Sequence, residues 1–165
     1  MALEPEVTDL AQLKERPEVA CLLAWNGTAV TGAKFDRSEL TIWVDRTALR
    51  GACQTLKDDS QLQYNVVADI TCVDWFPNEP RFEVVYHLFS TITRKRVRLK
   101  VRLSGADASV DSLVPLWPGA NFFEREVFDL FGIRFDEHPD LRRIMMPDNW
   151  DGHPLRKDYP VEGYR

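Results

Sequence analysis

The sequence predicts an α+β fold: an antiparallel-rich (mixed) sheet with helices on one face, followed by an extended C-terminal segment that docks on a partner. Strand-like segments follow one another in the middle of the chain, and segments with helical periodicity gather before and after them. Beyond Gly132 this periodicity stops. A chain of 165 residues suits one domain of ordinary size with an appendage, so we assign residues 1–133 to the domain and residues 134–165 to the appendage.

Short apolar or alternating runs mark the candidate strands, which we place at residues 19–25, 39–45, 64–75, 81–90 and 95–103. The connections between the last three strands are short enough for hairpins. Candidate helices begin at residues whose side chains can cap a helix, namely Thr8, Asp45, Ser109 and Asn121. The helix that follows Asp45 carries Leu49, Ala52, Cys53 and Leu56 on one face.

The strand at 95–103 alternates between cationic and apolar side chains, so its two faces differ. One face presents Val97, Leu99, Val101 and Leu103, and the other presents Arg96, Arg98, Lys100 and Arg102. The cationic face is typical of the solvated side of an antiparallel sheet, and it also suits a docking face for an acidic neighbour. Glu83 on the preceding strand is expected to lie across the hairpin and to offset part of the repulsion among the cations.

The last predicted helix leads into the C-terminal segment, and its apolar stripe consists of Phe123, Val127, Leu130 and Phe131. Asn121 is expected to cap this helix, with the Glu124 carboxylate reaching back to the N–H of the cap. Gly132 is expected to end the helix in the left-handed conformation. Helical geometry points Glu124, Arg125 and Glu126 in different directions, so we expect Glu124 to be held locally while Arg125 or Glu126 points outward.

Residues 134–165 mix charges with large apolar side chains. Four prolines exclude a long helix or a central strand, namely Pro139, Pro147, Pro154 and Pro160. Apolar anchors that a disordered tail would lack are Leu141, Ile144, Met145, Met146, Trp150, Leu155 and Tyr159. An extended ribbon of this kind cannot bury its anchors on a small domain, so we expect it to lie in a groove of a partner and to become ordered there.

The composition of the chain disfavours several classes of function and location. The net charge of −5 disfavours general nucleic-acid binding. No apolar run reaches the length of a membrane span, and the acidic N-terminus does not resemble a secretory signal, so we expect a cytoplasmic location. The thiols Cys21, Cys53 and Cys72 lack CxxC spacing and a fourth partner, so this chain is not expected to hold an iron–sulfur cluster, and the thiols are expected to be small buried hydrophobes.

Motifs of common enzymes are missing from the sequence. It contains neither GxGxxG after a strand nor the P-loop pattern, and neither HExxH nor GxSxG. The remaining candidates are His87, His138, His153, Asp140, Asp148 and Asp151. Their spacing does not place several ligands on one helical face, so structural turns are the favoured interpretation and no metal is expected. A free-standing metal-dependent hydrolase is kept as an alternative from another functional class.

Residues 124–160 resemble the C-subunit family of respiratory complex I, the companion of the quinone-site subunit of NADH-quinone oxidoreductase. The matching residues are Glu124–Glu126, Asp129–Ile133, His138–Ile144, Pro147, Asp148, Trp150 and Gly152–Pro160. A weaker resemblance extends back to about Asn65. Two residues depart from the family pattern: Glu137 stands where Gly is usual, and Asn149 stands where a second Asp is common.

The resemblance implies a cofactor-free, non-catalytic structural subunit in the hydrophilic arm of the complex, peripheral on the cytoplasmic side of the cell inner membrane. It implies that the C-terminal segment clasps the quinone-site subunit (the D subunit) near the B and I subunits, which carry iron–sulfur clusters. FMN and iron–sulfur clusters would lie in these and other partner subunits, and the complex would pass electrons from NADH to quinone (ubiquinone in many such complexes) while translocating protons. The equivalent subunit of a membrane-bound nickel–iron hydrogenase or of a ferredoxin–plastoquinone reductase is the main alternative.

The predicted partner interface is taken from the family motif and from the anchors. Its residues are Arg125, Glu126, His138, Asp140, Arg142, Arg143, Asp148, Trp150, His153, Arg156, Lys157, Asp158 and Tyr159. For Arg142, Arg143, Arg156 and Lys157, two interpretations are open: solvated surface charges that contribute little, or forks onto partner carboxylates. Because Arg is enriched at interfaces, we favour the second interpretation.

Overall fold

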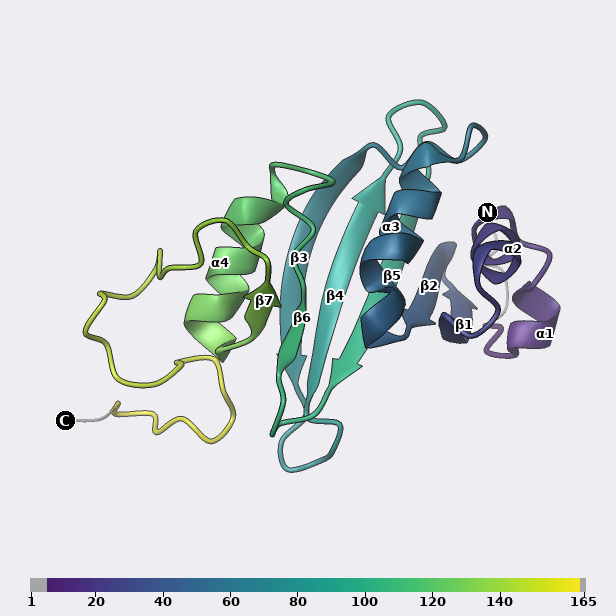
Figure 1. The fold of residues 1–165 in the computed structure, drawn as a ribbon. Coiled ribbons are helices and arrows are strands. Elements are labelled where there is room, and N and C mark those ends of the chain that lie inside the picture. The colour runs from purple at the N-terminus through teal and green to yellow at the C-terminus, as the bar shows by residue number, and fades with distance from the viewer. Residues whose placement is uncertain (1–5, 164–165) are drawn as a thin grey trace.

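The structure, a computed structural model, describes residues 6–163 of the chain. Five strands form one sheet with the spatial order β1-β2-β5-β4-β3 (Figure 1). They are β1 (Val30–Asp36), β2 (Glu39–Val44), β3 (Val66–Asp74), β4 (Phe82–Phe89) and β5 (Arg96–Leu103). Strands β2 and β5 are paired in parallel, and each of the other neighbouring pairs is antiparallel. The predicted α+β class with a mixed, antiparallel-rich sheet is therefore confirmed.

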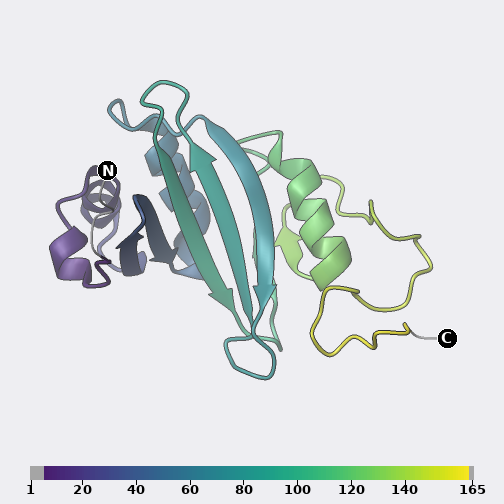
Figure 2. The same cartoon turned by 180° about the vertical axis from the view of Figure 1, so that it is seen from behind.

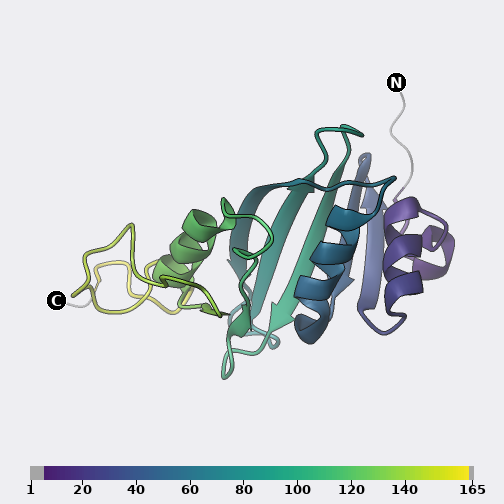
Figure 3. The same cartoon turned by 45° about the horizontal axis from the view of Figure 1, so that its top comes forward.

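The helices are grouped around one face and the two edges of this sheet. They are α1 (Leu10–Leu13), α2 (Pro17–Trp25), the 3-10 turn η1 (Arg46–Ala48), α3 (Leu49–Asp58) and α4 (Ala120–Phe131). Helix α3 lies across the front of the sheet, α1 and α2 lie at the β1 edge, and α4 lies beside β3 (Figures 1 and 3). From behind, β3, β4 and β5 are open, with none of the described helices across them (Figure 2). The C-terminal segment and the N-terminal helices thus lie at opposite ends of the sheet.

The hydrophobic core lies on the helix side of the sheet. The four apolar residues of β5 and the four of α3 that sequence periodicity selected are all buried, which confirms both predictions; they are Val97, Leu99, Val101, Leu103, Leu49, Ala52, Cys53 and Leu56. Asp45 accepts a hydrogen bond from the N–H of Thr47 and so caps η1, directly before α3. Cys72 is also buried and Cys21 is half-buried.

On the open face, Glu83 of β4 neutralises part of the cationic row, as predicted. The Glu83 carboxylate accepts hydrogen bonds from Lys100 at 2.6 Å, from Arg102 at 3.2 Å and from the indole of Trp43 at 3.0 Å. Burial raises the pKa of Glu83, but these hydrogen bonds and the Lys100 charge outweigh burial and lower the pKa below its usual value. The sheet therefore carries an ordered ion network on the face that lacks a helix.

The N-terminal third differs from the prediction. Residues 19–25 belong to helix α2 rather than to a strand, and β1 was not predicted. Pro17 occupies the first turn of α2, where its fixed φ favours a helix start, and a short apolar run alone does not distinguish a buried helix from a strand. Strand β1 is an edge strand that contains Gly32 and Lys34, which hide its alternation. The cap of α1 is Asp9 instead of Thr8.

Residues 109–116 also differ, since the predicted helix is replaced by a short strand. Strand β6 (Ser109–Asp111) pairs in parallel with β7 (Arg134–Asp136), which places the first residues after Ile133 inside the fold. Phe135 of β7 is 2 % exposed, so its side chain is part of the core. Two three-residue strands joined across more than twenty residues of chain leave no local periodicity from which this ladder could be predicted.

Helix α4 confirms the predicted end and overturns the predicted start. Gly132 has a φ of 73° in the left-handed region, and its N–H bonds to the Phe128 carbonyl, as expected of a glycine C-cap. The N-terminal cap is Gly119, without a side-chain hydrogen bond, so Asn121 does not cap the helix. Glu124 is fully buried and turned toward the domain, so the capping interaction predicted for its carboxylate is wrong.

Within residues 6–163, no helix combines the length and hydrophobicity that are needed to cross a membrane.

Candidate partner-binding site

The C-terminal segment, residues 137–163, follows an irregular path beside α4, and Asp129 of α4 is its main attachment. One carboxylate oxygen of Asp129 accepts hydrogen bonds from the backbone N–H groups of Ile144, Met145 and Met146 at 2.9, 2.7 and 2.9 Å. The other oxygen accepts a hydrogen bond from Arg143 at 2.8 Å. Burial raises the pKa of Asp129, but these donors outweigh burial and lower it. A charged, fully buried carboxylate therefore gathers three successive amides of the segment.

The same segment satisfies the last carbonyls of α4. A helix leaves its final C=O groups without intrahelical partners. Here the carbonyl of Asp129 accepts from Nδ1 of His153 at 2.9 Å, that of Leu130 from the N–H of Leu155 at 3.0 Å, and that of Phe131 from Nε of Arg156 at 2.6 Å. The C-terminal segment thus acts as an extended cap for the helix that precedes it.

Gly132 allows the side chains of His153 and Arg156 to approach the end of α4 closely. A Cβ atom at Gly132 would lie 2.5 Å from Nε2 of His153 and 2.5 Å from Nη2 of Arg156. The left-handed φ of Gly132 is a second reason for glycine, since other residues adopt it at a cost. Helix end and segment attachment therefore depend on the same residue.

A second attachment joins the segment to the turn between β3 and β4. Asp74, which is almost fully buried, pairs with Arg81 at 2.8 Å and accepts a hydrogen bond from the N–H of Lys157 at 2.8 Å. Arg81 also pairs with Asp158 at 2.6 Å. Burial raises the pKa of Asp74, but the Arg81 hydrogen bonds and the two backbone donors lower it to about 2. The arginine is thereby shared between the domain and the segment.

Glu124 forms a third, internal contact that links α4 to the residues directly after β6. Its carboxylate accepts hydrogen bonds from the Ser112 hydroxyl at 2.7 Å and from the N–H of Leu113 at 2.6 Å. Burial is the largest influence and raises the pKa of Glu124 to about 7. His138 lies 3.9 Å away and its pKa is lowered, chiefly by burial. Because Nδ1 of His138 accepts from the N–H of Asp140, Nε2 carries the proton and donates to the Asn121 carbonyl.

The side of the segment that faces solvent is rich in apolar surface. Exposed large side chains in the segment and in nearby turns are Ile144, Met145, Trp150, Leu155, Val161, Trp75 and Phe76. Trp150 is 41 % exposed and Met145 is 56 % exposed, although both are large apolar residues. Clusters of exposed apolar residues beside charges are typical of surfaces that bind another protein.

The structure places the thirteen predicted interface residues in two groups. Exposed residues, which can reach a partner, are Glu126, Asp140, Arg142, Asp148, Trp150, Lys157 and Asp158. The residues that are buried or half-buried are Arg125, His138, Arg143, His153, Arg156 and Tyr159. Arg125 donates to the carbonyl groups of Arg142 and Arg143, and the guanidinium of Arg143 binds Asp129.

Arg143 and Arg156 are therefore engaged inside the chain, where the sequence suggested forks onto a partner. Sequence reasoning missed Asp129, Asp74 and Arg81, which hold the segment. The signal for Asp129 was weak: an acidic residue in the last turn of a helix, where it opposes the helix dipole and so needs a specific partner.

The histidines and cysteines do not converge. Among the described residues, no group of three His, Cys, Asp or Glu side chains is arranged to hold a metal ion. His87 lies on the open face of the sheet, on β4, while His138 and His153 bind backbone carbonyls of α4. The polar side chains at this site hold backbone in place, and several of its large apolar side chains are exposed. Fold and site thus define a subunit built to join a larger assembly.

Comparison with known proteins identifies that assembly. Residues 42–165 match the family described as the respiratory-chain NADH dehydrogenase, 30 Kd subunit, and the chain belongs to this family. A relative from Geobacter sulfurreducens, the C subunit of an NADH-quinone oxidoreductase, is 50 % identical over 128 residues, covering 77 % of this chain and 78 % of the relative. The corresponding C subunit of a Roseiflexus species is 47 % identical over 133 residues, covering 81 % and 76 %.

Solved structures share the fold. A trypsin-resistant fragment (1–134) of Nqo5 is 34 % identical, with a TM-score of 0.57 over 62 % of this chain and 83 % of that chain. A chain of a membrane-bound sulfane sulfur reductase, an archaeal respiratory membrane complex, is 25 % identical, with a TM-score of 0.72 over 87 % of this chain and 84 % of that chain. The chain is thus a subunit of an NADH-quinone oxidoreductase, part of a complex I-type respiratory assembly.

Proposed function

We propose that this chain is a cofactor-free architectural subunit that clasps the quinone-site (D) subunit through its C-terminal segment, beside the B and I subunits, which carry iron–sulfur clusters. The observation that carries the proposal is the two-sided segment. Its backbone is attached to the chain through Asp129 and Asp74, while Trp150, Met145 and Leu155 remain exposed. A large apolar side chain held outward by a fixed backbone is a typical binding hot spot.

In this proposal the chain performs no chemical step. Electrons pass from NADH through FMN and iron–sulfur clusters held by partner subunits to quinone, and this chain holds the quinone-site subunit in position. In the proposal this chain lies peripherally on the cytoplasmic side of the inner membrane, and proton translocation belongs to the complex as a whole. Support comes from the roughly half-identical relatives, which are C subunits of NADH-quinone oxidoreductases.

Affinity purification of the tagged full-length chain, followed by identification of the bound chains, tests the proposal. We expect the D, B and I subunits together with FMN-containing partners. Co-purification with a nickel–iron hydrogenase or a ferredoxin-fed complex would instead indicate that this chain is the equivalent subunit of such an assembly. The similarity to a chain of the sulfane sulfur reductase supports testing this alternative, because it shows the fold in a different respiratory membrane complex. A monomer with bound metal and hydrolytic turnover would contradict both.

Trp150→Ala measures the contribution of the anchor. Loss of a hot-spot Trp costs about 2 kcal/mol or more, so we expect the dissociation constant for the quinone-site subunit to rise about thirtyfold while the melting temperature of the free chain is unchanged. Trp25→Ala is the matched control, because Trp25 is 43 % exposed, close to the 41 % of Trp150. Trp25 is the last residue of α2, which lies at the opposite end of the sheet. Equal binding by the wild type and the Trp150 variant would contradict the proposal.

A further inference from the structure

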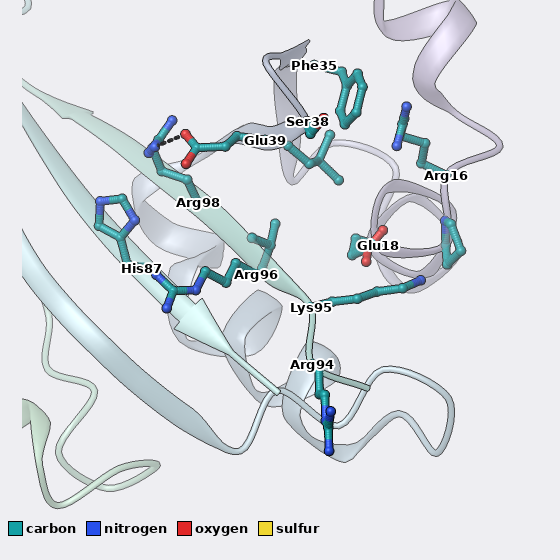
Figure 4. A pocket seen from close by; sticks show the side chains of 13 residues that line it. Arg16, Glu18, Phe35, Ser38, Glu39, His87, Arg94, Lys95, Arg96 and Arg98 are labelled. Atoms are coloured by element: carbon teal, nitrogen blue, oxygen red, sulfur yellow. Dashed lines mark hydrogen bonds and ion pairs between the residues drawn. The ribbon is translucent and has the colours of Figure 1, made fainter. Parts of the chain in front are cut away.

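A pocket of about 640 Å³ lies at the end of the sheet that is remote from the C-terminal segment. It is bounded by the start of α2, by the turn between β1 and β2, and by the start of β5, with the neighbouring β4 residue His87 (Figure 4). Phe35, Leu40 and Val97 form apolar parts of its wall. No residue of the C-terminal segment lines this pocket, so the pocket is separate from the proposed partner-binding site.

The pocket is cationic although the chain is acidic. Five of its lining residues are Arg or Lys and two are Glu, whereas the whole chain carries a net charge of −5. The pKa of His87 is lowered by burial and then by Arg98, so His87 is neutral near pH 7 and adds no charge. Concentration of one charge sign in a concave site attracts a partner of the opposite sign.

Several charged groups at the pocket are already paired. Arg98 binds Glu39, and the buried Glu18 accepts a hydrogen bond from the hydroxyl of Tyr64. Further along the same face, Lys100 and Arg102 bind Glu83. Both glutamates that line the pocket thus have partners within the chain.

In the described part of the chain, the cations at the β4–β5 turn, unlike those further along β5, are not paired with carboxylates. Across residues 6–163, no carboxylate lies within ion-pairing distance of Arg94, Lys95 or Arg96, and all three are exposed. Arg96 packs its guanidinium over the Phe89 ring at 5.5 Å, which orients the side chain without neutralising it. Three successive cations at one rim repel one another, and an acidic ligand relieves that repulsion.

We propose that this pocket is a docking site for an extended acidic segment of a neighbouring protein chain. In Figure 4 the three side chains diverge: Lys95 extends toward α2, Arg96 lies near His87, and Arg94 points away from both. Divergent cations match carboxylates distributed along a peptide better than one compact anion, which requires converging donors. Nucleic acid is disfavoured by the net charge of the chain.

The site lies at the opposite end of the sheet from the clasp, so the subunit would contact two neighbours at once, and the second contact does not depend on the first. Failure of one proposal therefore leaves the other standing.

Binding of a fluorescein-labelled peptide of Asp and Glu with one Leu to the full-length chain tests this inference by fluorescence anisotropy. The reference peptide replaces each acid by Asn or Gln. We expect the acidic peptide alone to bind, and the double substitution Lys95→Gln and Arg96→Gln to raise its dissociation constant about tenfold at low salt, with a smaller effect at high salt. Arg102→Gln is the control, since Arg102 lies on the same strand face and is held by Glu83. We expect this variant to bind like the wild type.

Amide chemical shifts provide a second measurement that does not rely on variants. The peptide should shift the signals of residues 94–98 and leave those of residues 101–103 unchanged. The inference is overturned if the double variant binds like the wild type, if the neutral peptide binds equally well, or if the shifts fall elsewhere. Tighter binding of inorganic pyrophosphate than of the peptide would also overturn it, because the pocket would then be a small-anion site.

Discussion

Asp129→Asn is the sharpest test of how the C-terminal segment is held. The substitution preserves shape but removes the charge and one acceptor oxygen. If the remaining oxygen faces the amides of residues 144–146, the new NH₂ group opposes the guanidinium of Arg143, which now lies 2.8 Å from a carboxylate oxygen. If the amide group is turned around, the NH₂ group opposes three N–H donors instead. Neither orientation satisfies all four donors.

The magnitude follows from these contacts. Removing one partner of a buried charge pair costs about 3–5 kcal/mol. Arg143 has 16 % of its side chain exposed and can turn toward water, so we expect the lower value, about 3 kcal/mol. This free energy holds the segment rather than the core. The detached form of the segment should therefore become about a hundredfold more populated.

Limited trypsin digestion of the full-length chain measures the detached population. When detachment is fast compared with cleavage, the cleavage rate follows the population of the open form. Cutting after Arg142 and Arg143 should accelerate about a hundredfold, while sites within the sheet stay protected. Asp148→Asn is the matched control, because Asp148 is an exposed acid in the same segment. Cleavage within about twofold of the wild-type rate, or simultaneous cleavage of the sheet, would refute the reasoning.

Two further substitutions test the helix that carries the attachment. Gly132→Ala places an alanine in the left-handed conformation, which costs about 1–2 kcal/mol, and brings its Cβ against His153 and Arg156. The melting temperature should therefore fall by several degrees. Gly119→Ala is the control: the new Cβ meets open space, so the melting temperature should not change. Glu124→Gln tests the raised pKa. A carboxyl whose pKa rises from 4.5 to about 7 on folding stabilises the fold below pH 4.5 and loses this contribution as the pH rises through 7, by up to about 3 kcal/mol. Between about pH 5 and about pH 8, the free energy of unfolding measured in urea should therefore fall less in the variant than in the wild type. The lowered pKa of His138 makes the free energy of unfolding rise with pH, but only at acid pH and in both proteins. Equal slopes for wild type and variant would contradict the assignment.

Features governed by neighbours along the chain were predictable from sequence. The alternation in β5 and the helical spacing of Leu49, Ala52, Cys53 and Leu56 each depend on one periodicity, and both are confirmed. Gly132 was predictable because few residues adopt its conformation. Glu83 followed from hairpin register alone.

Features governed by distant contacts were not predictable in the same way. Glu124 has the spacing of a capping box, yet its partners are Ser112 and Leu113, which precede α4, and burial of the carboxylate overrides the local rule. The β6–β7 ladder joins two strands too short to show alternation. Residues 19–25 are all apolar and form helix α2, which packs on α3 and on β1, but an apolar run of that length suits a strand equally well.

The attachments of the segment also change how its binding should be understood. A segment that became ordered only on its partner would lose its chain entropy at the moment of binding, which lowers the affinity obtained from a given interface. Here Asp129 already fixes three successive amides, and the end of α4 fixes His153, Leu155 and Arg156. Much of that entropy is therefore lost during folding, before the partner arrives. A preorganised ribbon with Trp150 and Met145 facing outward can bind at a smaller ordering cost. On this argument, weakening Asp129 should weaken assembly as well, although Asp129 is fully buried in the free chain and need not touch the partner.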